Sequence, residues 1–393
     1  MARPSGASPQ QANPADVNMA ARNAVLGSAI KMTQQIFTTT LTGTAAGQVI
    51  NVQPRNVGLI TGFIIKVTAN VAQSAAETQT LTTLGLANIF SNVTFTDLSN
   101  QQRINTTGWH LHLLASARRQ SVFGAAFTTD SPNAGTQTTP ANFGSNWRVI
   151  YAAATLTTVV PISMYYEIPL AYSDFDLRGA IYASVVSATM NLQLTVNPNF
   201  GVGTGADATN AVYISSTAAL PLVTSVVITV YQQYLDQLPM GKNGVILPIL
   251  DLSTAYLLNN TTVTGLVANQ DLPIPYANFR NFMSTIAIYD NAGVLNVGSD
   301  LAYFALQSAN YTNIFKYDPQ TAALFTREIM LDDMPKGVYY FDHRRRPIST
   351  VQYGNMSLVV NPSAVTAGAS VLLGYEALAL INMVTQAGSL YGT

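Results

Sequence analysis

The chain has 393 residues, of which 48% are apolar and only 9% are charged, and its net charge is −1. Globular proteins typically contain about 25% charged residues, so charge is unusually scarce here. The near-zero net charge argues against broad electrostatic attraction to nucleic acid or to an anionic membrane. The absence of cysteine excludes disulfides, thiolate metal sites and a cysteine nucleophile.

The length predicts two or three domains, with enough apolar residues for sizeable cores. Scarce charge favours a surface that is largely covered by other subunits, because the cores of protein interfaces are depleted of charged residues. The first residues, MARPSGASPQQANPADVNM, lack the apolar core of a secretion signal. We also find no run of about 18 to 20 apolar residues that would span a bilayer.

Residues 1–40 are expected to form an N-terminal arm with an amphipathic helix. Residues 1–13 have little to bury and predict disorder. Asn13 is a suitable N-cap and Pro14 suits the first helical position. Apolar residues then recur at helical spacing, at Val17, Ala21, Ala24, Val25, Met32 and Ile36.

The arm carries a small positive excess over residues 1–36, 3 − 1 = +2. An amphipathic, mildly basic helix can lie on a membrane or on another subunit. The candidates for such contacts are Val17, Arg22, Val25 and Lys31. Packing of the helix on its own domain is the alternative.

From residue 36 onward the pattern predicts an all-β protein. Short runs of Val, Ile, Thr, Tyr and Phe alternate with Gly, Pro, Asn and Asp, as in VGLITGFIIKVTANV and LVTSVVITVY. Many short strands separated by turn signals are typical of sandwiches and barrels. Besides the arm, only Gln232–Leu238 and the region around Gln320–Arg327 suggest helix.

Four stretches of the first half recur, in the same order, in the second half. GFIIKV at 62–67 parallels STIAIY at 284–289, an offset of 284 − 62 = 222, and the tyrosine pair at 165–166 parallels the pair at 339–340, an offset of 339 − 165 = 174. VNP at 196–198 recurs at 360–362, an offset of 360 − 196 = 164. The strand around Tyr231 recurs around Tyr375, an offset of 375 − 231 = 144. The steadily shrinking offset predicts a duplicated fold whose second copy has shorter loops.

The stretch between the copies, YLDQLPMGKNGVILPILDLSTAY, contains Pro239, Gly241 and Gly244 and is interpreted as a linker. We therefore divide the chain into an arm (1–40), a first β-sandwich (41–245), a second β-sandwich (246–384) and a tail (385–393).

Two of the three histidines, His110 and His112, lie in GWHLHLL. In a β-strand this spacing puts both imidazoles on one face, where a strand can offer two ligands to zinc. A catalytic zinc needs a third protein ligand, and the remaining histidine, His343, belongs to the second copy. We therefore interpret the pair as part of a structural strand and expect neither a metal nor a cofactor.

The only dense basic run is Arg344-Arg345-Arg346. It is interpreted as a solvated loop or as the arginine half of a contact between subunits, with phosphate binding as the alternative. The acid pairs at Asp174/Asp176 and Asp332/Asp333 do not establish a glycosidase site, since such enzymes need carboxyls that converge across a cleft. No set of residues predicts catalysis, so we do not expect an enzyme.

Several longer stretches resemble a known family. They are GWHLH (108–112), YEIPLAYSDFDLRGA (166–180), YQQYLDQLPMGKNGVILPILDLSTAY (231–256), STIAIYDNAG (284–293), MPKGVYYFDHRRRPISTVQYGN (334–355) and LLGYEAL (372–378). Together they resemble the major coat proteins of tectiviruses, tailless bacteriophages with a membrane inside an icosahedral shell. The likeness runs from about residue 55 to residue 378.

This resemblance implies two eight-stranded jelly rolls in tandem, and a homotrimer with a pseudo-hexagonal outline. Such trimers tile a shell around an internal membrane and double-stranded DNA, and an N-terminal helix at the base of the trimer faces the membrane. It further implies vertex and minor capsid proteins as partners, assembly in the bacterial cytoplasm and no sequence-specific binding of nucleic acid. The family has no catalytic residues.

Two rival functions remain open from the residues alone. One is a carbohydrate-binding β-sandwich protein that uses Trp109, Trp147 and tyrosines as sugar platforms. The other is a trimeric phage receptor-binding spike. Sizing of the purified chain separates the first from a coat protein, and the abundance of the chain in the shell separates the second.

Overall fold

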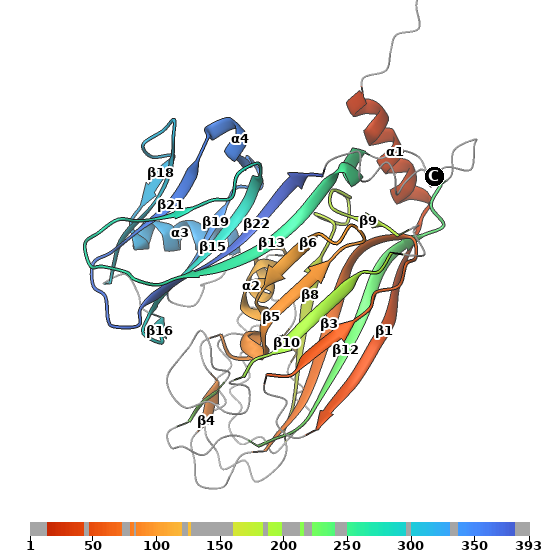
Figure 1. Cartoon of the computed structure of the whole chain (residues 1–393), viewed down its shortest axis with the longest axis horizontal. Helices are drawn as coiled ribbons and strands as arrows, with labels where there is room; N and C mark the ends of the chain where they lie inside the picture. The colour runs from red at the N-terminus through yellow and green to blue at the C-terminus, as the bar shows by residue number, and fades with distance from the viewer. Residues whose placement is uncertain are drawn as a thin grey trace, which may run out of the picture.

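The fold was analysed in a computed structural model. It describes residues 14–42, 47–72, 79–81, 84–119, 125–126, 160–183, 188–198, 213–215, 222–239, 250–295, 300–330 and 337–381. The predicted disorder of residues 1–13, the linker boundary near 245 and the tail at 385–393 therefore lie outside the described residues. Figure 1 shows two β-barrels side by side, with the helix α1 (Pro14–Ser28) at one end of the molecule.

The first barrel is an eight-stranded jelly roll made of two four-stranded layers, extended by short strands at their edges. One layer has the order β1-β12-β3-β8 and the other β2-β10-β5-β6, and every pair inside these layers is antiparallel. The strands are β1 (Ile30–Thr42), β2 (Val49–Val52), β3 (Leu59–Ala72), β5 (Phe90–Thr96), β6 (Gln102–Thr106), β8 (Val160–Pro169), β10 (Asn191–Val196) and β12 (Leu222–Asp236).

The second barrel repeats this topology strand for strand. Its layers are β13-β22-β15-β19 and β14-β21-β17-β18. The strands are β13 (Thr254–Val263), β14 (Leu272–Pro275), β15 (Asn281–Asn291), β17 (Leu301–Ser308), β18 (Phe315–Tyr317), β19 (Val338–Asp342), β21 (Met356–Pro362) and β22 (Ser370–Leu380). The predicted duplication and the all-β class are confirmed.

Each barrel has one helix at the same point of its chain path. The helix α2 (Gly108–Arg119) lies between β6 and β8, and α3 (Pro319–Met330) lies between β18 and β19. The remaining described elements are short: α4 (Thr350–Tyr353), two 3₁₀ turns (Gly85–Ile89 and Leu250–Ser253), and the strands β4 (Gln79–Leu81), β7 (Ala125–Ala126), β9 (Ile181–Tyr182), β11 (Tyr213–Ser215), β16 (Val294–Leu295) and β20 (Ile348–Ser349).

All four repeated stretches fall in equivalent strands, but two of them were aligned one residue out of register. Ile65 and Ala287, with an offset of 287 − 65 = 222, both face the interior of their barrels. They pair with Tyr166 and Tyr339. The structural offset at this strand is therefore 339 − 166 = 173, not 174. A one-residue slip turns a side chain to the other face of a sheet.

The strand around Tyr231 shows the same slip. Tyr231 is half-buried on the outward face of its layer, whereas Tyr375 belongs to the core of the second barrel. Tyr231 pairs with Ile64 of β3, and Gly374 pairs with Ile286 of β15. The structural counterpart of Tyr231 is therefore Gly374, at an offset of 374 − 231 = 143.

Three other predictions of local structure were wrong. The N-terminal helix begins at Pro14 as expected but ends at Ser28, and Ile30–Thr42 forms strand β1, so the first barrel begins inside the predicted arm. Gln232–Leu238 is not a helix, because residues up to Asp236 continue strand β12 and pair with both β1 and β3. GWHLHLL is not a strand but opens helix α2.

Candidate functional site: the junction between the two barrels

The two barrels share one continuous sheet. Strand β6 of the first barrel pairs in parallel with β13 of the second, with Ile104 opposite Leu258 and Asn105 opposite Asn259. One layer of the first barrel therefore runs directly into a layer of the second, giving a ten-stranded sheet. This backbone pairing ties the two barrels together at one edge.

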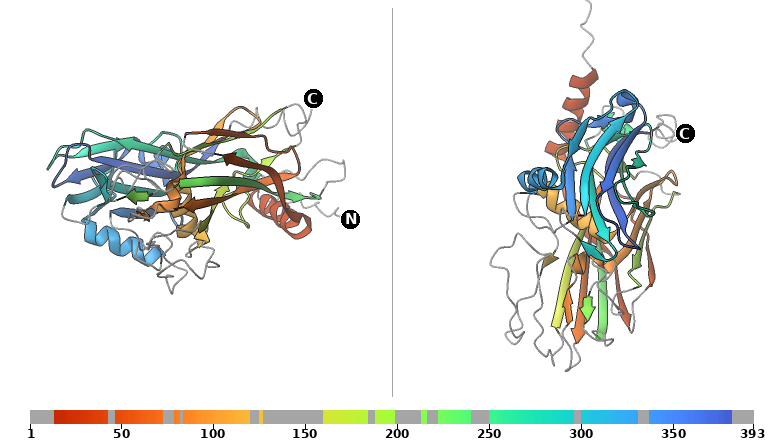
Figure 2. Two further views of the ribbon diagram at one scale, coloured as in Figure 1. Left: turned by 90° about the horizontal axis from the view of Figure 1, so that it is seen from below. Right: turned by 90° about the vertical axis from the view of Figure 1, so that its left-hand side faces the viewer.

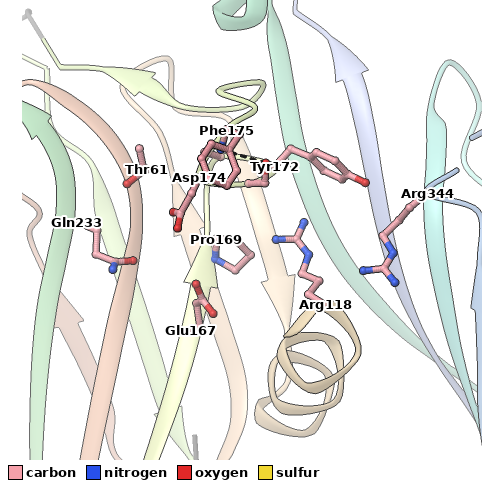
Figure 3. A pocket seen from close by; sticks show the side chains of 11 residues that line it. Thr61, Arg118, Glu167, Pro169, Tyr172, Asp174, Phe175, Gln233 and Arg344 are labelled. Carbon is pink, nitrogen blue, oxygen red and sulfur yellow. Dashed lines mark hydrogen bonds between the residues drawn. The ribbon is translucent and has the colours of Figure 1, made fainter. Parts of the chain in front are cut away.

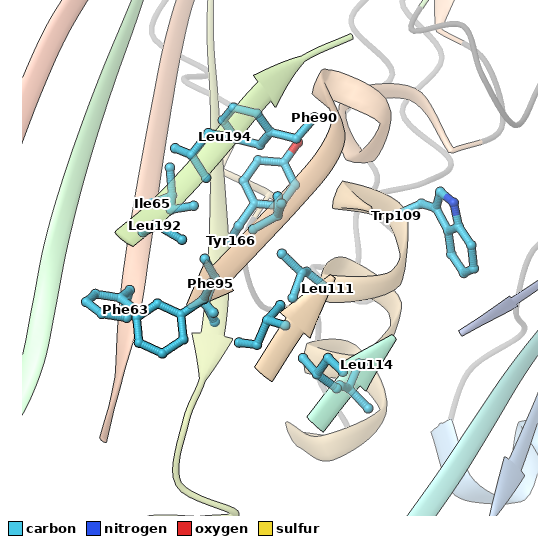
Figure 4. Close-up of a cluster of buried hydrophobic side chains, with 14 of the residues drawn as sticks. Phe63, Ile65, Phe90, Phe95, Trp109, Leu111, Leu114, Tyr166, Leu192 and Leu194 are labelled. Atoms are coloured by element: carbon cyan, nitrogen blue, oxygen red, sulfur yellow. The ribbon is translucent and has the colours of Figure 1, made fainter. Parts of the chain in front are cut away.

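Helix α2 fills the space beside this shared sheet. Residues 108–117 of the helix are all buried, so it has no solvent-exposed face over that length. Figure 4 shows Leu111 on the side of α2 that faces Phe95 and other side chains of the first barrel, whereas Trp109 points toward the second barrel. The same cluster includes outward-facing side chains of the second barrel, namely Met283, Ile286, Ile288, Tyr340 and Leu378.

His110 packs directly against the second barrel. Its ring is completely buried and lies so near Gly374 of β22 that a Cβ there would meet three ring atoms at 2.4 to 2.6 Å. Thr106 Oγ1 lies 2.6 Å from His110 Nδ1 and fixes the ring. Burial lowers the pKa of His110 to about 4, so the imidazole is neutral at neutral pH.

The C-terminal end of α2 is held by a buried ion pair. Arg118 Nη2 donates to Glu376 Oε1 at 2.5 Å, and Ser284 Oγ donates to Glu376 Oε2 at 2.6 Å. Burial on its own raises the pKa of Glu376, but the charge of Arg118 and the Ser284 hydrogen bond outweigh it and lower the pKa. Arg118 also lies over the ring of Tyr256, 5.0 Å from its centroid. The carboxylate therefore stays ionised inside the junction.

The arginine run divides into one paired and two exposed residues. Arg344 forms a two-pronged contact with Asp342, with Nε–Oδ1 at 2.9 Å and Nη2–Oδ2 at 3.0 Å. Burial alone lowers the pKa of Arg344, but the bonds to Asp342 raise it above its usual value. Arg345 and Arg346 are exposed and remain available for contacts outside the chain.

A hollow of about 350 Å³ opens beside the junction (Figure 3). Thr61, Glu167 and Gln233 line it from the first barrel, and Arg118 and Arg344 face it from the junction. Both arginines already have carboxylate partners. The other lining residues are Pro169, Ala171, Tyr172, Ser173, Asp174 and Phe175.

The histidines are not brought together as metal ligands by the residues that the structure describes. His110 and His112 lie two positions apart on a helix, so their side chains point in different directions rather than to one face. His343 is stacked on Phe315, with ring centroids 6.2 Å apart, and burial lowers its pKa to about 4. Among the described residues, no group of three His, Asp or Glu side chains is placed to hold a metal ion.

Helix α1 packs on its own chain through one side. Val25 is completely buried, in a small cluster with Leu59, Leu235 and Leu252. Arg22 Nε lies 3.1 Å from Asp251 Oδ2. The exposed Lys31 forms a surface ion pair with Asp174 at 2.9 Å. The side chain of Val17 lies outside the described part of the helix.

No helix within the described part of the chain is long and apolar enough to cross a membrane.

Two jelly rolls of one topology, standing side by side in one chain, define the fold of the double jelly-roll viral major capsid proteins. A chain of the Sulfolobus turreted icosahedral virus has this fold with a TM-score of 0.63, at 11% identity and over 91% of this chain and 93% of that one. A chain of the PBCV-1 virus capsid aligns with a TM-score of 0.51, at 10% identity and over 90% and 95%. These likenesses concern the fold alone.

Sequence comparison identifies the family. Residues 8–238 match the family described as P3 major capsid protein N-terminal, and residues 253–391 match P3 major capsid protein C-terminal. The major capsid protein P3 of Enterobacteria phage PRD1 is 40% identical over 381 residues, covering 96% of this chain and 94% of that protein. The chain belongs to the P3 major capsid protein family. It is a viral major capsid protein, which confirms the resemblance to tectivirus coat proteins and the expectation of a structural role.

Proposed function

We propose that this capsid protein assembles as a homotrimer that fills the six-coordinated positions of an icosahedral shell. The observation that carries the proposal is the strand-for-strand repetition of one barrel within the chain. Three chains then supply six similar barrels, so one gene product gives a nearly hexagonal unit that can meet six neighbours through similar contacts. Neighbouring trimers, vertex proteins and minor capsid proteins are its further partners.

The end of the molecule that carries α1 is the surface proposed to face an internal membrane that encloses double-stranded DNA. Large apolar side chains are exposed there: Met19 is 53% exposed, Phe175 81% and Leu380 83%. Phe175 follows Asp174, the partner of Lys31, and Leu380 pairs with Thr254, close to Asp251, the partner of Arg22. Exposed apolar groups together with basic residues are typical of a surface that binds the lipid interface.

The arrangement gives different roles to the residues singled out in the sequence. Val25 anchors α1 to the first barrel, whereas Met19, Lys31 and Phe175 are the groups proposed to reach lipid. The exposed Arg345 and Arg346 are proposed to contact a neighbouring subunit. Neither proposal involves sequence-specific recognition of nucleic acid. The cysteine-free composition is compatible with the proposed assembly in a reducing bacterial cytoplasm.

Sedimentation of the purified full chain tests the trimer. We expect a species of three chains at micromolar concentration, and a stable monomer there would contradict the proposal. Flotation with liposomes tests the membrane end. Met19→Asp and Phe175→Asp should reduce co-flotation while leaving the sedimentation of the trimer unchanged, and equal flotation of wild type and variants would refute this assignment. Electron microscopy of particles separates a shell protein from a spike, since the shell protein must be the most abundant component.

A further inference from the structure

Helices α2 and α3 occupy equivalent places in the two barrels. Each follows the strand at the edge of one layer, β6 or β18, and precedes the strand at the edge of the other, β8 or β19. Helix α3 contacts β17, β18 and β19 of its own barrel, and α2 contacts β5 and β8 of its own. Both helices therefore close the same seam between the two layers.

The outer sides of the two helices have different surroundings. The outer side of α2 is covered by the second barrel, through His110 on Gly374 and Arg118 on Glu376. Helix α3 turns Ala322 and Thr326 inward, but Leu324 is 55% exposed and Phe325 40% exposed. Figure 2 shows α3 on the outside of the molecule in both views. Within the described part of the chain, the helix thus presents an apolar side that is left uncovered.

The surface that covers α2 has a counterpart on the first barrel. In the second barrel it is the outward face of β13-β22-β15-β19, where Ile286 pairs with Gly374. The corresponding pair in the outward face of β1-β12-β3-β8 is Ile64 with Tyr231. Ile64, Tyr231 and Val227 on this face are half-buried, and the hollow lined by Thr61, Glu167 and Gln233 opens on it.

We infer that α3 of one copy packs on the outward face of β1-β12-β3-β8 of the next copy, reproducing between chains the contact that α2 makes within the chain. Leu324 and Phe325 then lie against Ile64, Val227 and Tyr231 of the neighbour. The edge strand β18 comes beside the neighbour's edge strand β1, as β6 lies beside β13 in the chain. Two different surfaces meet, so the contact is head-to-tail and closes into a ring after three copies. The inference rests on the proposed homotrimer and specifies its interface.

Charge placed on the exposed side of α3 tests the interface. Leu324→Asp combined with Phe325→Asp should abolish the trimer at a concentration where the wild type is wholly trimeric, and leave monomers with unchanged far-ultraviolet circular dichroism. The monomer should remain folded because Leu324 and Phe325 are exposed side chains of the helix, and Phe325 packs only at the surface, on the ring of Tyr317. The matched control is Val267→Asp, since Val267 is 51% exposed but lies in the β13–β14 loop. The control should remain trimeric.

Crosslinking gives an independent test, because the natural chain has no cysteine. Leu324→Cys combined with Ile64→Cys, treated with a short bismaleimide, should give covalent dimers and trimers on a denaturing gel. Each single-cysteine variant should give neither, since a head-to-tail contact does not bring a surface against itself. A monomeric wild type would refute the proposed trimer. A trimeric double-aspartate variant, or crosslinking of Leu324→Cys alone, would overturn this interface while leaving the trimer intact.

Discussion

The contact between His110 and Gly374 allows the energetics of the barrel junction to be tested with one methyl group. In Gly374→Ala the new Cβ would lie 2.4 Å from His110 Cδ2 and 2.6 Å from Cγ and Nε2. Ordinary contacts of this kind are about 3.5 to 4.0 Å, so the ring or the strand must move by about 1 Å. The ring is completely buried and bonded to Thr106, so it has little freedom to do so.

Overpacking of this kind costs roughly 1 to 3 kcal/mol, and the absence of free space places Gly374→Ala at the upper end. About 3 kcal/mol corresponds to a fall of roughly 6 to 12 °C in the midpoint of thermal unfolding for a domain of this size. The control is Gly27→Ala in α1, where a Cβ meets no atom within 4 Å. That variant should be neutral or slightly more stable, because alanine is the better helix former.

A double-mutant cycle isolates the contact. His110→Ala removes the ring and should itself be destabilising, but adding Gly374→Ala to it should cost much less than in the wild type. We expect a coupling free energy of about 2 kcal/mol or more between the two sites. Additive effects, or a Gly374→Ala variant that melts like the Gly27→Ala control, would refute the proposed packing of α2 against β22.

Three further predictions concern buried charge and the N-terminal helix. Glu376→Gln leaves Arg118 buried without its counter-charge and should lower the free energy of unfolding by about 3 kcal/mol or more. Adding Arg118→Met should restore part of the lost stability. Equal melting temperatures of the wild type and Glu376→Gln would contradict a stabilising role of the ion pair. His110 has a pKa of about 4 in the folded chain and about 6.5 in the unfolded chain. The unfolded chain therefore binds the proton first, and the free energy of unfolding falls by up to about 3 kcal/mol as the pH drops from 6.5 to 4. Denaturant unfolding of His110→Gln should show a smaller loss between these pH values, and a loss equal to that of the wild type would contradict the role of His110. Val25→Asp buries a charge between Leu59 and Leu235 and should lower the melting temperature strongly, whereas Met19→Asp should not. Equal melting temperatures of the two variants would contradict the packing of α1 on the first barrel through Val25.

The architecture could be predicted from the sequence because four stretches of the first barrel recur in the same order in the second, with an offset that shrinks along the chain. The matching identified the equivalent strands in all four stretches, but two of the four alignments were one residue out of register. Two adjacent tyrosines, such as Tyr165 and Tyr166, can be aligned in either of two ways with Tyr339 and Tyr340. Only the backbone pairing shows which one faces the core. Sequence similarity between the two halves therefore identifies equivalent strands more easily than it identifies which residues of those strands face the core.

Helix α2 was missed because the usual signal of a helix is absent from it. Apolar and polar residues alternate in GWHLHLL as in a strand, yet residues 108–117 are buried on all sides, so no polar stripe marks the helical period. The duplication could have revealed this helix. Helix α3 was predicted, and the starts of α3 and α2 have an offset of 319 − 108 = 211, which lies between the offsets of 222 and 174 found on either side. Mapping the predicted helix back by such an offset would have located α2.

The same helix-on-sheet contact should have different energetics inside and between chains. Packing of α2 on the second barrel is intramolecular, so its contribution does not depend on protein concentration, whereas packing of α3 on a neighbour does. The melting temperature of the wild type should therefore rise with concentration, and that of the Leu324→Asp, Phe325→Asp variant should not. Differential scanning calorimetry over a hundredfold range of concentration measures both. A wild type whose melting temperature is independent of concentration would mean that the interface of α3 adds nothing to the stability of the fold.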